Sequence, residues 1–205
     1  MCKICKNKTI DKAIKNINYH FCPFCGFLAK DDSVILDSDK EFERYQKHDN
    51  NDNMGYVKYQ EDFYQMIKDY LGKNVLDYGC GNGHILANII NKNEHVCSYY
   101  DLYFYPKENI EKSLYNAIIL EEVVEHLKDP VLVLSNVIKF LDSNGNLIIR
   151  TRFIPSNVFD SDWWYLRDTT HISFFDIKTF EYLSKVFGLE IIYCNDKDLI
   201  ILKKV

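Results

Sequence analysis

Residues Val75 to Gly83 read VLDYGCGNG and carry the strongest fold signal in the chain. The stretch begins as an apolar strand, passes through an acid, Asp77, and then places Gly79, Gly81 and Gly83 before a helical pattern. Glycine accepts positive φ angles and has no Cβ atom, so a ligand can approach the backbone of such a loop closely. N–H groups at the start of the following helix add polar donors. The stretch therefore predicts a ligand-binding loop between a buried strand and a helix.

A second acid, Asp101, ends the next predicted strand, HVCSYYD, eighteen residues after Gly83. In dinucleotide-type folds an acid at this place binds the hydroxyl groups of a ribose. Nicotinamide and flavin sites usually show Gly-x-Gly-x-x-Gly spacing, which turns the helix N-terminus toward a pyrophosphate. This loop has Gly-x-Gly-x-Gly spacing preceded by Asp77. An acid beside the ligand suits a cation better than a pyrophosphate.

Strand and helix patterns alternate along the rest of the chain. Helices are predicted over residues 37–46, 60–71, 84–92, 130–141 and 176–187, and strands over residues 74–78, 95–101, 115–120, 146–151 and twice within 189–204. Such alternation indicates a mostly parallel sheet covered by helices on both faces. The last two strands flank an Asn-Asp-Lys-Asp turn, which indicates a hairpin. We expect an α/β, Rossmann-like sheet with an antiparallel terminal hairpin.

Length and composition fit one globular domain with a small appendage. The chain has 205 residues, of which 47% are apolar and 27% charged, so it can bury a core. No apolar run approaches the roughly 18 residues of a membrane span, and the N-terminal MCKICKNKTIDK has no apolar signal segment. We expect a cytoplasmic protein without a membrane partner. Residues 1–30 contain six lysines and one aspartate, or +5, so the rest of the −5 chain carries −10.

Four of the seven cysteines are clustered near the N-terminus. They form two Cys-x-x-Cys pairs, made by Cys2 and Cys5 and by Cys22 and Cys25. The sixteen residues between the pairs match the spacing of a zinc ribbon. His20 is a substitute ligand, although four thiols already complete a tetrahedron. We expect residues 1–30 to be a small zinc-ribbon-like module that folds around a structural Zn²⁺.

The glycine loop and its acid resemble the first motifs of the class I S-adenosylmethionine-dependent methyltransferases, and YNAIILEEVVEHLKDP resembles their fourth motif. The resemblance covers residues 60–205 and implies S-adenosylmethionine as the cofactor. It implies that the loop wraps the methionine part and that Asp101 binds both ribose hydroxyls. Glu121 and Glu122 fall at the carboxyl end of a strand, where open α/β sheets bind ligands. The expected cofactor-binding residues are Asp77, Gly79, Gly81, Gly83, Asp101, Leu102, Glu121, Glu122 and Tyr56.

Two details of this resemblance qualify the expected site. Only thirteen residues separate Asp101 from Tyr115, too few for a full helix and a third strand. The adenine site is therefore expected to be reduced, with Leu102 or Tyr103 beside the base. The Glu-His pair at 125–126 reads either as an ordinary helix start or as a family feature that is not the chemical base.

Residues 157–175, NVFDSDWWYLRDTTHISFF, concentrate aromatic side chains in one loop. Long loops at the carboxyl edge of a sheet often carry function. One interpretation is a hydrophobic plug built on Phe174 and Phe175. The other makes the segment a substrate wall, with His171 as general base because its pKa lies near neutrality, and Asp168 orienting it or holding Arg167. The expected wall residues are Trp163, Trp164, Tyr165 and Arg167.

The segment before the methyltransferase motifs is polar and aromatic. Residues 31–60 are expected to be a linker or lid, followed by a methyltransferase domain at 61–205. FERYQKHDNNDNMGYVKYQ resembles the lead-in of a small bacterial methyltransferase branch that shares the WWY-x-RD-x-THI-x-F segment. Tyr45, His48 and Tyr56 are candidates for a lid over the cofactor, with a solvated linker as the alternative.

Together these features predict an S-adenosylmethionine-dependent methyltransferase, a transferase of the EC 2.1.1 type, that acts first of all on a small molecule. One alternative is an RNA or protein methyltransferase that recruits its substrate through the basic zinc module. The −10 body argues against an extended nucleic-acid footprint. Another alternative is a non-catalytic zinc-binding interaction protein on the same fold, against which the intact glycine loop argues.

Overall fold

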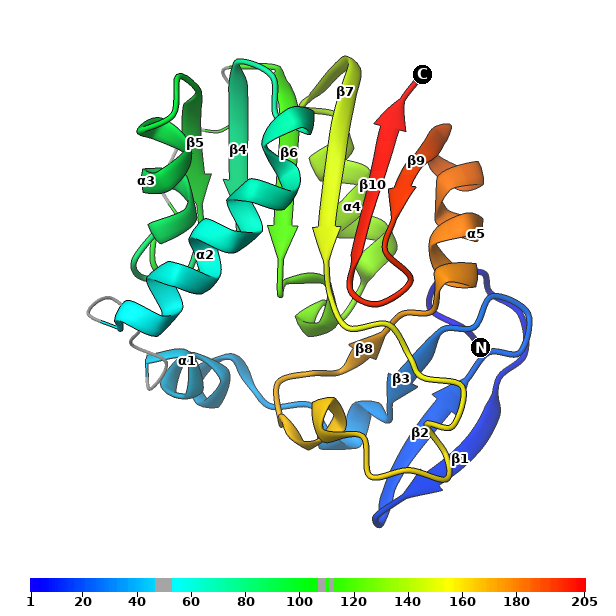
Figure 1. The fold of residues 1–205 in the computed structure, drawn as a ribbon. Helices are drawn as coiled ribbons and strands as arrows, with labels where there is room; N and C mark the ends of the chain where they lie inside the picture. The colour runs from blue at the N-terminus through cyan, green and yellow to red at the C-terminus, as the bar shows by residue number, and fades with distance from the viewer. Residues whose placement is uncertain (47–52, 107–109, 111–112) are drawn as a thin grey trace.

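The computed structural model describes residues 1–46, 53–106, 110 and 113–205, and within them the central sheet has six strands in the order β5-β4-β6-β7-β10-β9 (Figure 1). The strands are β4 (Asn74–Tyr78), β5 (Val96–Tyr100), β6 (Tyr115–Glu121), β7 (Leu141–Arg150), β9 (Leu189–Cys194) and β10 (Leu199–Lys204). Strands β4 to β7 are parallel, whereas β10 is antiparallel to both β7 and β9. The predicted α/β sheet with an antiparallel terminal hairpin is confirmed.

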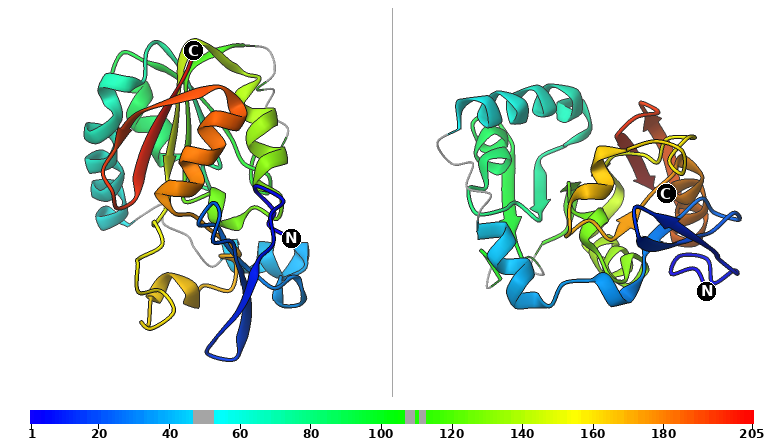
Figure 2. Two further views of the ribbon diagram at one scale, coloured as in Figure 1. Left: turned by 90° about the vertical axis from the view of Figure 1, so that its right-hand side faces the viewer. Right: turned by 90° about the horizontal axis from the view of Figure 1, so that it is seen from below.

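Helices lie on both faces of this sheet, as the left view of Figure 2 shows. One face is covered by α2 (Met54–Ile67) and α3 (Ile85–Asn91), and the other by α4 (Pro130–Ile138) and α5 (Ile177–Phe187). Side chains of β6 alternate between the two cores. Ala117 and Ile119 pack with α2 and α3, whereas Ile118 and Leu120 pack with α4 and α5. The fully buried strand positions explain why β6 reads as a nearly continuous apolar run.

A second sheet lies beyond the carboxyl ends of the parallel strands, at the lower edge in Figure 1. Its order is β1-β2-β3-β8, with three strands from the N-terminal segment and one from the aromatic loop. The strands are β1 (Ile10–Ile14), β2 (Ile17–Phe21), β3 (Leu28–Lys30) and β8 (Ser173–Phe174). The N-terminal module is therefore completed by a strand from the opposite end of the chain.

Further hydrogen bonds join the N-terminal module to α5 and to the segment before β8. The Thr179 hydroxyl donates to the carbonyl of Cys25 at 2.8 Å, and Lys178 Nζ donates to the carbonyl of Pro23 at 3.1 Å. In addition, Lys30 N donates to Ile172 O at 3.0 Å. The four clustered cysteines belong to the same apolar cluster as the core under α4 and α5. The module and the large sheet thus share one core.

Two element boundaries differ from the sequence expectation. Helix α2 begins at Met54 because Asn53 Oδ1 caps it by accepting from the N–H groups of Gly55 and Tyr56, so the boundary expected at residue 60 falls inside the helix. The turn expected before residue 146 lies inside β7, where Asn144 has a φ of 63° and the pairing with β6 shifts. Among the described residues no strand lies between β5 and β6, which agrees with the short spacing after Asp101.

A short helix, α1 (Ser38–Gln46), lies near the carboxyl ends of β4 and β5. Within the described ranges, no helix is both long and apolar enough to cross a membrane. The residue His48, expected in the lid, lies outside the described residues.

Candidate cofactor and acceptor site

The glycine loop folds back sharply after β4. Gly79 has a φ of 91° and Gly81 a φ of 65°, both in the left-handed region. A Cβ atom on Gly79 would lie 2.4 Å from Val123 Cγ2, so this position has no room for a side chain. The N–H of Gly79 donates to Tyr100 O at 2.7 Å, which ties the loop to the end of β5. Of the loop glycines, Gly83 lies in the turn just before α3.

The carboxylate of Asp101 joins the glycine loop to the turn after β5. Its Oδ2 accepts from Gly81 N at 3.0 Å, and its Oδ1 accepts from the N–H groups of Tyr103 and Phe104 at 2.9 and 3.1 Å. Two carboxylate oxygens offer about four lone-pair sites, so these three bonds leave acceptor capacity. The carboxylate is therefore oriented beside the loop and can still accept from a ligand hydroxyl.

Helix α1 packs over the turn that follows Asp101. Phe42 stacks on Tyr103 with ring centroids 5.4 Å apart, and the Tyr103 hydroxyl donates to Glu41 at 2.7 Å. Tyr45 lies 5.4 Å from Tyr103 between ring centroids. Leu102 is 64% exposed beside these residues. Of the two residues expected beside adenine, Tyr103 is thus engaged by α1, and Leu102 remains open to a ligand.

Asp77 lies beneath the loop and is only 3% exposed. Burial is the largest influence on this carboxyl, followed by the nearby Glu121, and together they raise its pKa from 3.8 to about 8. In the absence of ligand the side chain is therefore protonated near neutral pH. A bound cation would favour the ionised form.

This shift predicts how stability depends on pH. Between pH 4 and 8 the native Asp77 carboxyl holds a proton that the unfolded chain has lost, so the free energy of unfolding falls as pH rises. We expect a loss of about 2 kcal/mol between pH 6 and pH 8.5 in the ligand-free protein, measured by denaturant unfolding. Asp77→Asn should reduce this slope without abolishing it, because the raised pKa of Glu121 contributes a slope of the same sign. Asp69→Asn at an exposed site should leave the slope unchanged. Equal slopes in wild type and Asp77→Asn would contradict the assignment.

A cleft of about 320 Å³ opens next to the carboxyl end of β6. It is lined from α2, from the end of β6, from the segment after β7 and from the aromatic loop. The lining residues are Tyr56, Tyr59, Gln60, Glu121, Glu122, Arg152 and Trp164. The structure brings together here three residues expected to bind cofactor and one expected in the substrate wall.

Glu121 forms one wall of the cleft and is held by Arg150. The Arg150 guanidinium donates from Nη1 to Glu121 Oε1 at 3.1 Å and lies 4.5 and 4.7 Å from the ring centres of Tyr59 and Phe63. Burial raises the pKa of Glu121 to about 7, although the charge of Arg150 opposes the shift. The cleft therefore contains an acid that titrates near neutral pH.

Tyr165 lies behind the cleft, 1% exposed, and its hydroxyl contacts two carboxyl groups. Its oxygen is 2.9 Å from Glu122 Oε2 and 2.5 Å from Glu125 Oε1. Glu125 is fully buried, and burial raises the pKa of both glutamates. Glu122 has a positive φ of 52°, a strained conformation for a residue with a side chain. Tyr165 thus supports the acid side of the cleft from the inside.

The other wall residues divide between the interior and the surface. Trp164 is 57% exposed at the cleft, whereas Trp163 packs on Tyr165 and Phe174 at centroid distances of 5.3 and 5.8 Å. Arg167 Nη2 donates to Asp162 at 2.5 Å on the surface. The aromatic loop is therefore both a plug, through Trp163 and Phe174, and a cleft wall, through Trp164.

His171 and Asp168 belong to the same loop. His171 is 8% exposed, and its Nδ1 is 3.0 Å from Tyr165 O. Burial lowers the pKa of His171, which keeps the ring neutral near pH 7. Asp168 pairs with Arg44 from α1 at 3.2 Å and accepts from Thr170, so the expectation that it holds Arg167 is wrong. It closes the aromatic loop onto α1.

Sequence reasoning missed three of the cleft residues. Tyr59 and Gln60 follow Tyr56 at helical spacing, but the helix was expected to begin only at residue 60. Arg152 follows the carboxyl end of β7, so the rule that placed Glu121 at the sheet edge would also have found it.

The four N-terminal cysteines converge as a buried cluster. Their ligand atoms lie within 4.8 Å of one another, with Cys2 Sγ 3.6 Å from Cys25 Sγ and Cys5 Sγ 3.4 Å from Cys22 Sγ. Sulfur atoms of a tetrahedral zinc site at about 2.3 Å from the metal would lie about 3.8 Å apart. Four thiols at this spacing fit Zn²⁺.

His20 lies apart from the thiol cluster in its bonding. Its two ring nitrogens contact Asp11 and Asp31 at 2.8 and 2.9 Å. His20 therefore has two carboxylate partners and does not belong to the group of four cysteines. This agrees with the expectation that four thiols already complete a tetrahedral site.

The mostly parallel sheet, the glycine loop beside Asp101 and the adjoining cleft define a Rossmann-like α/β protein with a cleft at the carboxyl edge of its sheet. The chain belongs to a methyltransferase domain family, whose model matches residues 45–193. Family membership supports S-adenosylmethionine as the methyl donor. No curated protein matches the sequence.

Solved structures share this fold at low sequence identity. An O-methyltransferase family protein from Burkholderia thailandensis is 14% identical with a TM-score of 0.56, over 78% of this chain and 61% of that one. The mitomycin 7-O-methyltransferase MmcR is 12% identical with a TM-score of 0.57, over 80% and 60%. A SAM-dependent methyltransferase from Archaeoglobus fulgidus is 16% identical with a TM-score of 0.54, over 82% and 100%. This chain thus spans about 60% of the length of the two O-methyltransferase structures.

Proposed function

We propose that this protein transfers the methyl group of S-adenosylmethionine to a small-molecule acceptor held in the cleft beside Glu121 and Glu122. The observation that carries the proposal is the bond from Gly81 N to Asp101 Oδ2, because it brings the glycine loop and the ribose-type acid into one site. Leu102 is exposed beside this acid and could flank adenine. The cleft adjoins this site along the carboxyl edge of the sheet.

When bound, the cofactor supplies an electrophilic methyl group on a positively charged sulfur. The chain's own part is to align the acceptor and to exclude water from it. Tyr56, Tyr59 and Trp164 line the cleft and offer aromatic faces, which attract cations as well as apolar groups. Glu121 and Glu122 offer the carboxylates that could receive a proton from the acceptor.

The size and lining of the cleft favour a small acceptor. Its volume of about 320 Å³ lies at the lower end for small-molecule sites. Two structural neighbours are O-methyltransferases, and one of them is named for mitomycin. These names accord with a small acceptor that offers an oxygen atom.

The basic N-terminal module gives less support to an RNA acceptor. Lys3 pairs with Asp32 at 2.7 Å, Lys15 pairs with Asp162, and Lys30 is only 3% exposed. The local partners cancel part of the +5 charge that would attract phosphates.

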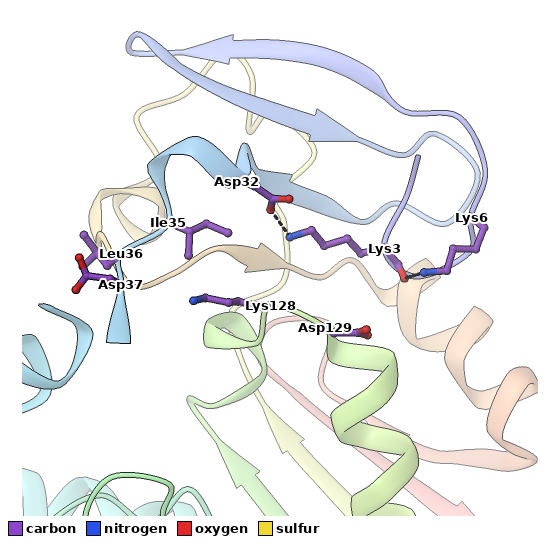
Figure 3. A pocket seen from close by; sticks show the side chains of 8 residues that line it. All are labelled: Lys3, Lys6, Asp32, Ile35, Leu36, Asp37, Lys128 and Asp129. Atoms are coloured by element: carbon purple, nitrogen blue, oxygen red, sulfur yellow. Dashed lines mark hydrogen bonds and ion pairs between the residues drawn. The ribbon is translucent and has the colours of Figure 1, made fainter. Parts of the chain in front are cut away.

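A larger depression of about 560 Å³ lies between this module and α4, shown in Figure 3. Lysines and aspartates line it in equal number, three of each, together with two apolar residues. Its lining residues are Lys3, Lys6, Lys128, Asp32, Asp37, Asp129, Ile35 and Leu36. This mixed lining does not favour an extended anion.

Methyl transfer can be tested directly with the zinc-replete protein and S-adenosylmethionine carrying a labelled methyl group. Separate small-molecule, RNA and protein fractions of a cell extract serve as acceptors. We expect label in the small-molecule fraction, and none after Asp101→Ala. Label in RNA would favour the alternative, and no label in any fraction despite cofactor binding would favour the non-catalytic alternative.

Trp164 offers a separate test of the acceptor wall. Because its ring is 57% exposed at the cleft and packs edge-on against Tyr165, Trp164→Ala should fold normally. We expect about 10-fold or greater loss of kcat/KM for the acceptor, with unchanged affinity for S-adenosylhomocysteine. A matched Val186→Ala variant at an exposed apolar position of α5 should change neither. If Trp164→Ala weakened the binding of S-adenosylhomocysteine as much as it lowered kcat/KM for the acceptor, Trp164 would not be a residue of the acceptor wall.

A further inference from the structure

A group of metal-ligating side chains lies behind the cleft, away from the thiol cluster. The ligand atoms of Glu125, His126 and His171 lie within 4.8 Å of one another. Glu125 and His171 are buried, at 0% and 8% exposure, and the two histidine rings meet edge-on with centroids 4.8 Å apart. Two imidazoles and one carboxylate form a donor set that suits a divalent cation.

Each histidine has its Nδ1 beside a backbone carbonyl oxygen. His126 Nδ1 lies 3.0 Å from Thr170 O, and His171 Nδ1 lies 3.0 Å from Tyr165 O. A carbonyl only accepts, so each Nδ1 carries the proton and donates it. In the neutral ring this makes Nε2 the basic nitrogen. Backbone carbonyls commonly orient metal-binding histidines in this way.

The carboxylates show a matching arrangement around Tyr165. Glu125 Oε1 is bonded to the Tyr165 hydroxyl at 2.5 Å, whereas its buried Oε2 lacks a hydrogen-bond partner among the described residues. Glu122 Oε2 contacts the same hydroxyl at 2.9 Å. An unpartnered buried carboxylate oxygen costs free energy unless an ion or proton binds it.

We propose that Glu125, His126 and His171 bind a divalent cation of the Mn²⁺ type. The mixture of carboxylate and imidazole donors separates this site from the four-thiol zinc site, whose soft ligands bind Mn²⁺ poorly. Tyr165 is the positioning residue, since its carbonyl orients His171 and its hydroxyl orients both carboxylates. In this assignment His171 is a metal ligand and does not act as the general base.

The site has a consequence for the acceptor, which rests on the proposed function. Glu122 lines the cleft and contacts the same Tyr165 hydroxyl as Glu125, so a cation held by Glu125 would lie close to the acceptor. Hydroxyl oxygens are good ligands for hard cations. The cation would therefore select an acceptor with an oxygen that can coordinate it.

Cation binding is tested by titrating Mn²⁺ into the zinc-replete full chain without cofactor or acceptor, following the loss of the free-ion signal by electron paramagnetic resonance. We expect one Mn²⁺ per chain, with nitrogen couplings from coordinated imidazole in the pulsed spectrum. Glu125→Gln and His171→Gln should each weaken binding at least about 100-fold, and Tyr165→Phe about 10-fold to 100-fold. His95→Gln is the matched control, because His95 Nδ1 also contacts a backbone carbonyl, that of Gly72, on the surface.

The wild-type measurement alone can overturn the proposal, even if a variant fails to fold. No Mn²⁺ binding at millimolar concentration, binding without nitrogen couplings, or undiminished binding by Glu125→Gln would each do so. Methyl transfer is absent from this titration, so its result is independent of whether the protein is a methyltransferase. A chain that binds Mn²⁺ but not S-adenosylhomocysteine would retain the cation site and lose the proposed function.

Discussion

Asp101→Ala is expected to weaken the binding of S-adenosylhomocysteine about 100-fold or more. The carboxylate is oriented by Gly81, Tyr103 and Phe104 and retains acceptor capacity for a ribose diol. Two hydrogen bonds to a charged group contribute about 1.5–3 kcal/mol each, and a loss of about 3 kcal/mol is roughly a 100-fold change in affinity. Isothermal titration calorimetry measures this change directly.

The effect of Asp101→Ala must be separated from loss of the loop structure. Asp101→Asn keeps an oxygen that can accept from backbone N–H groups, so it should retain more affinity than the alanine variant. Asp69→Ala, at an exposed acid after α2, should bind like wild type. Unchanged affinity in Asp101→Ala would mean that the ribose is held elsewhere.

A Zn²⁺ ion bound by the thiol cluster would stabilise the whole protein and not the N-terminal module alone. The module shares the core with α4 and α5, and β3 pairs with β8 from the aromatic loop. Structural zinc contributes folding free energy outright in small modules that lack a core of their own. We expect Cys22→Ser with Cys25→Ser to lower the midpoint of thermal unfolding by at least about 10 °C, since several kcal/mol are lost.

This disruption should also reach the aromatic loop. Ile172 O accepts from Lys30 N, and Ile172 N donates to Glu125 O, so the backbone beside His171 links the module to the cleft. Hydrogen exchange should therefore increase over residues 163–174 as well as over 1–30. Cys194→Ser, which lies outside the thiol cluster, is the control. Increased exchange confined to residues 1–30 would show that the module unfolds independently of the site.

The periodic parts of the fold were readable because burial imposes a simple pattern on them. Strand β6 is buried on both faces, and its apolar run was read correctly. The helix pattern of α5 ends at Gly188, which has a φ of 64°, so its end was also predictable. The spacing of the glycines and of Asp101 was enough to predict that they lie close together. The glycines follow β4, Asp101 follows the neighbouring parallel strand β5, and both strands end at the same edge of the sheet.

Contacts between segments that are far apart in the sequence could not be predicted from local sequence patterns. Nothing in the local pattern of Ser173–Phe174 shows that this short strand pairs with β3, since pairing depends on where the chain returns in space. Tyr165 was expected to face a substrate, yet its ring is buried and its hydroxyl supports Glu122 and Glu125. An aromatic residue in a dense loop can face either way, and the packing of the whole loop decides between them.

The chain is expected to bind S-adenosylmethionine at the loop of Gly79 and Gly81, beside Asp101. The most direct measurement is a calorimetric titration of the zinc-replete wild-type protein with S-adenosylhomocysteine. We expect one site per chain with micromolar or tighter affinity, and about 100-fold weaker binding by Asp101→Ala. Absence of binding by folded, zinc-replete protein would contradict this expectation.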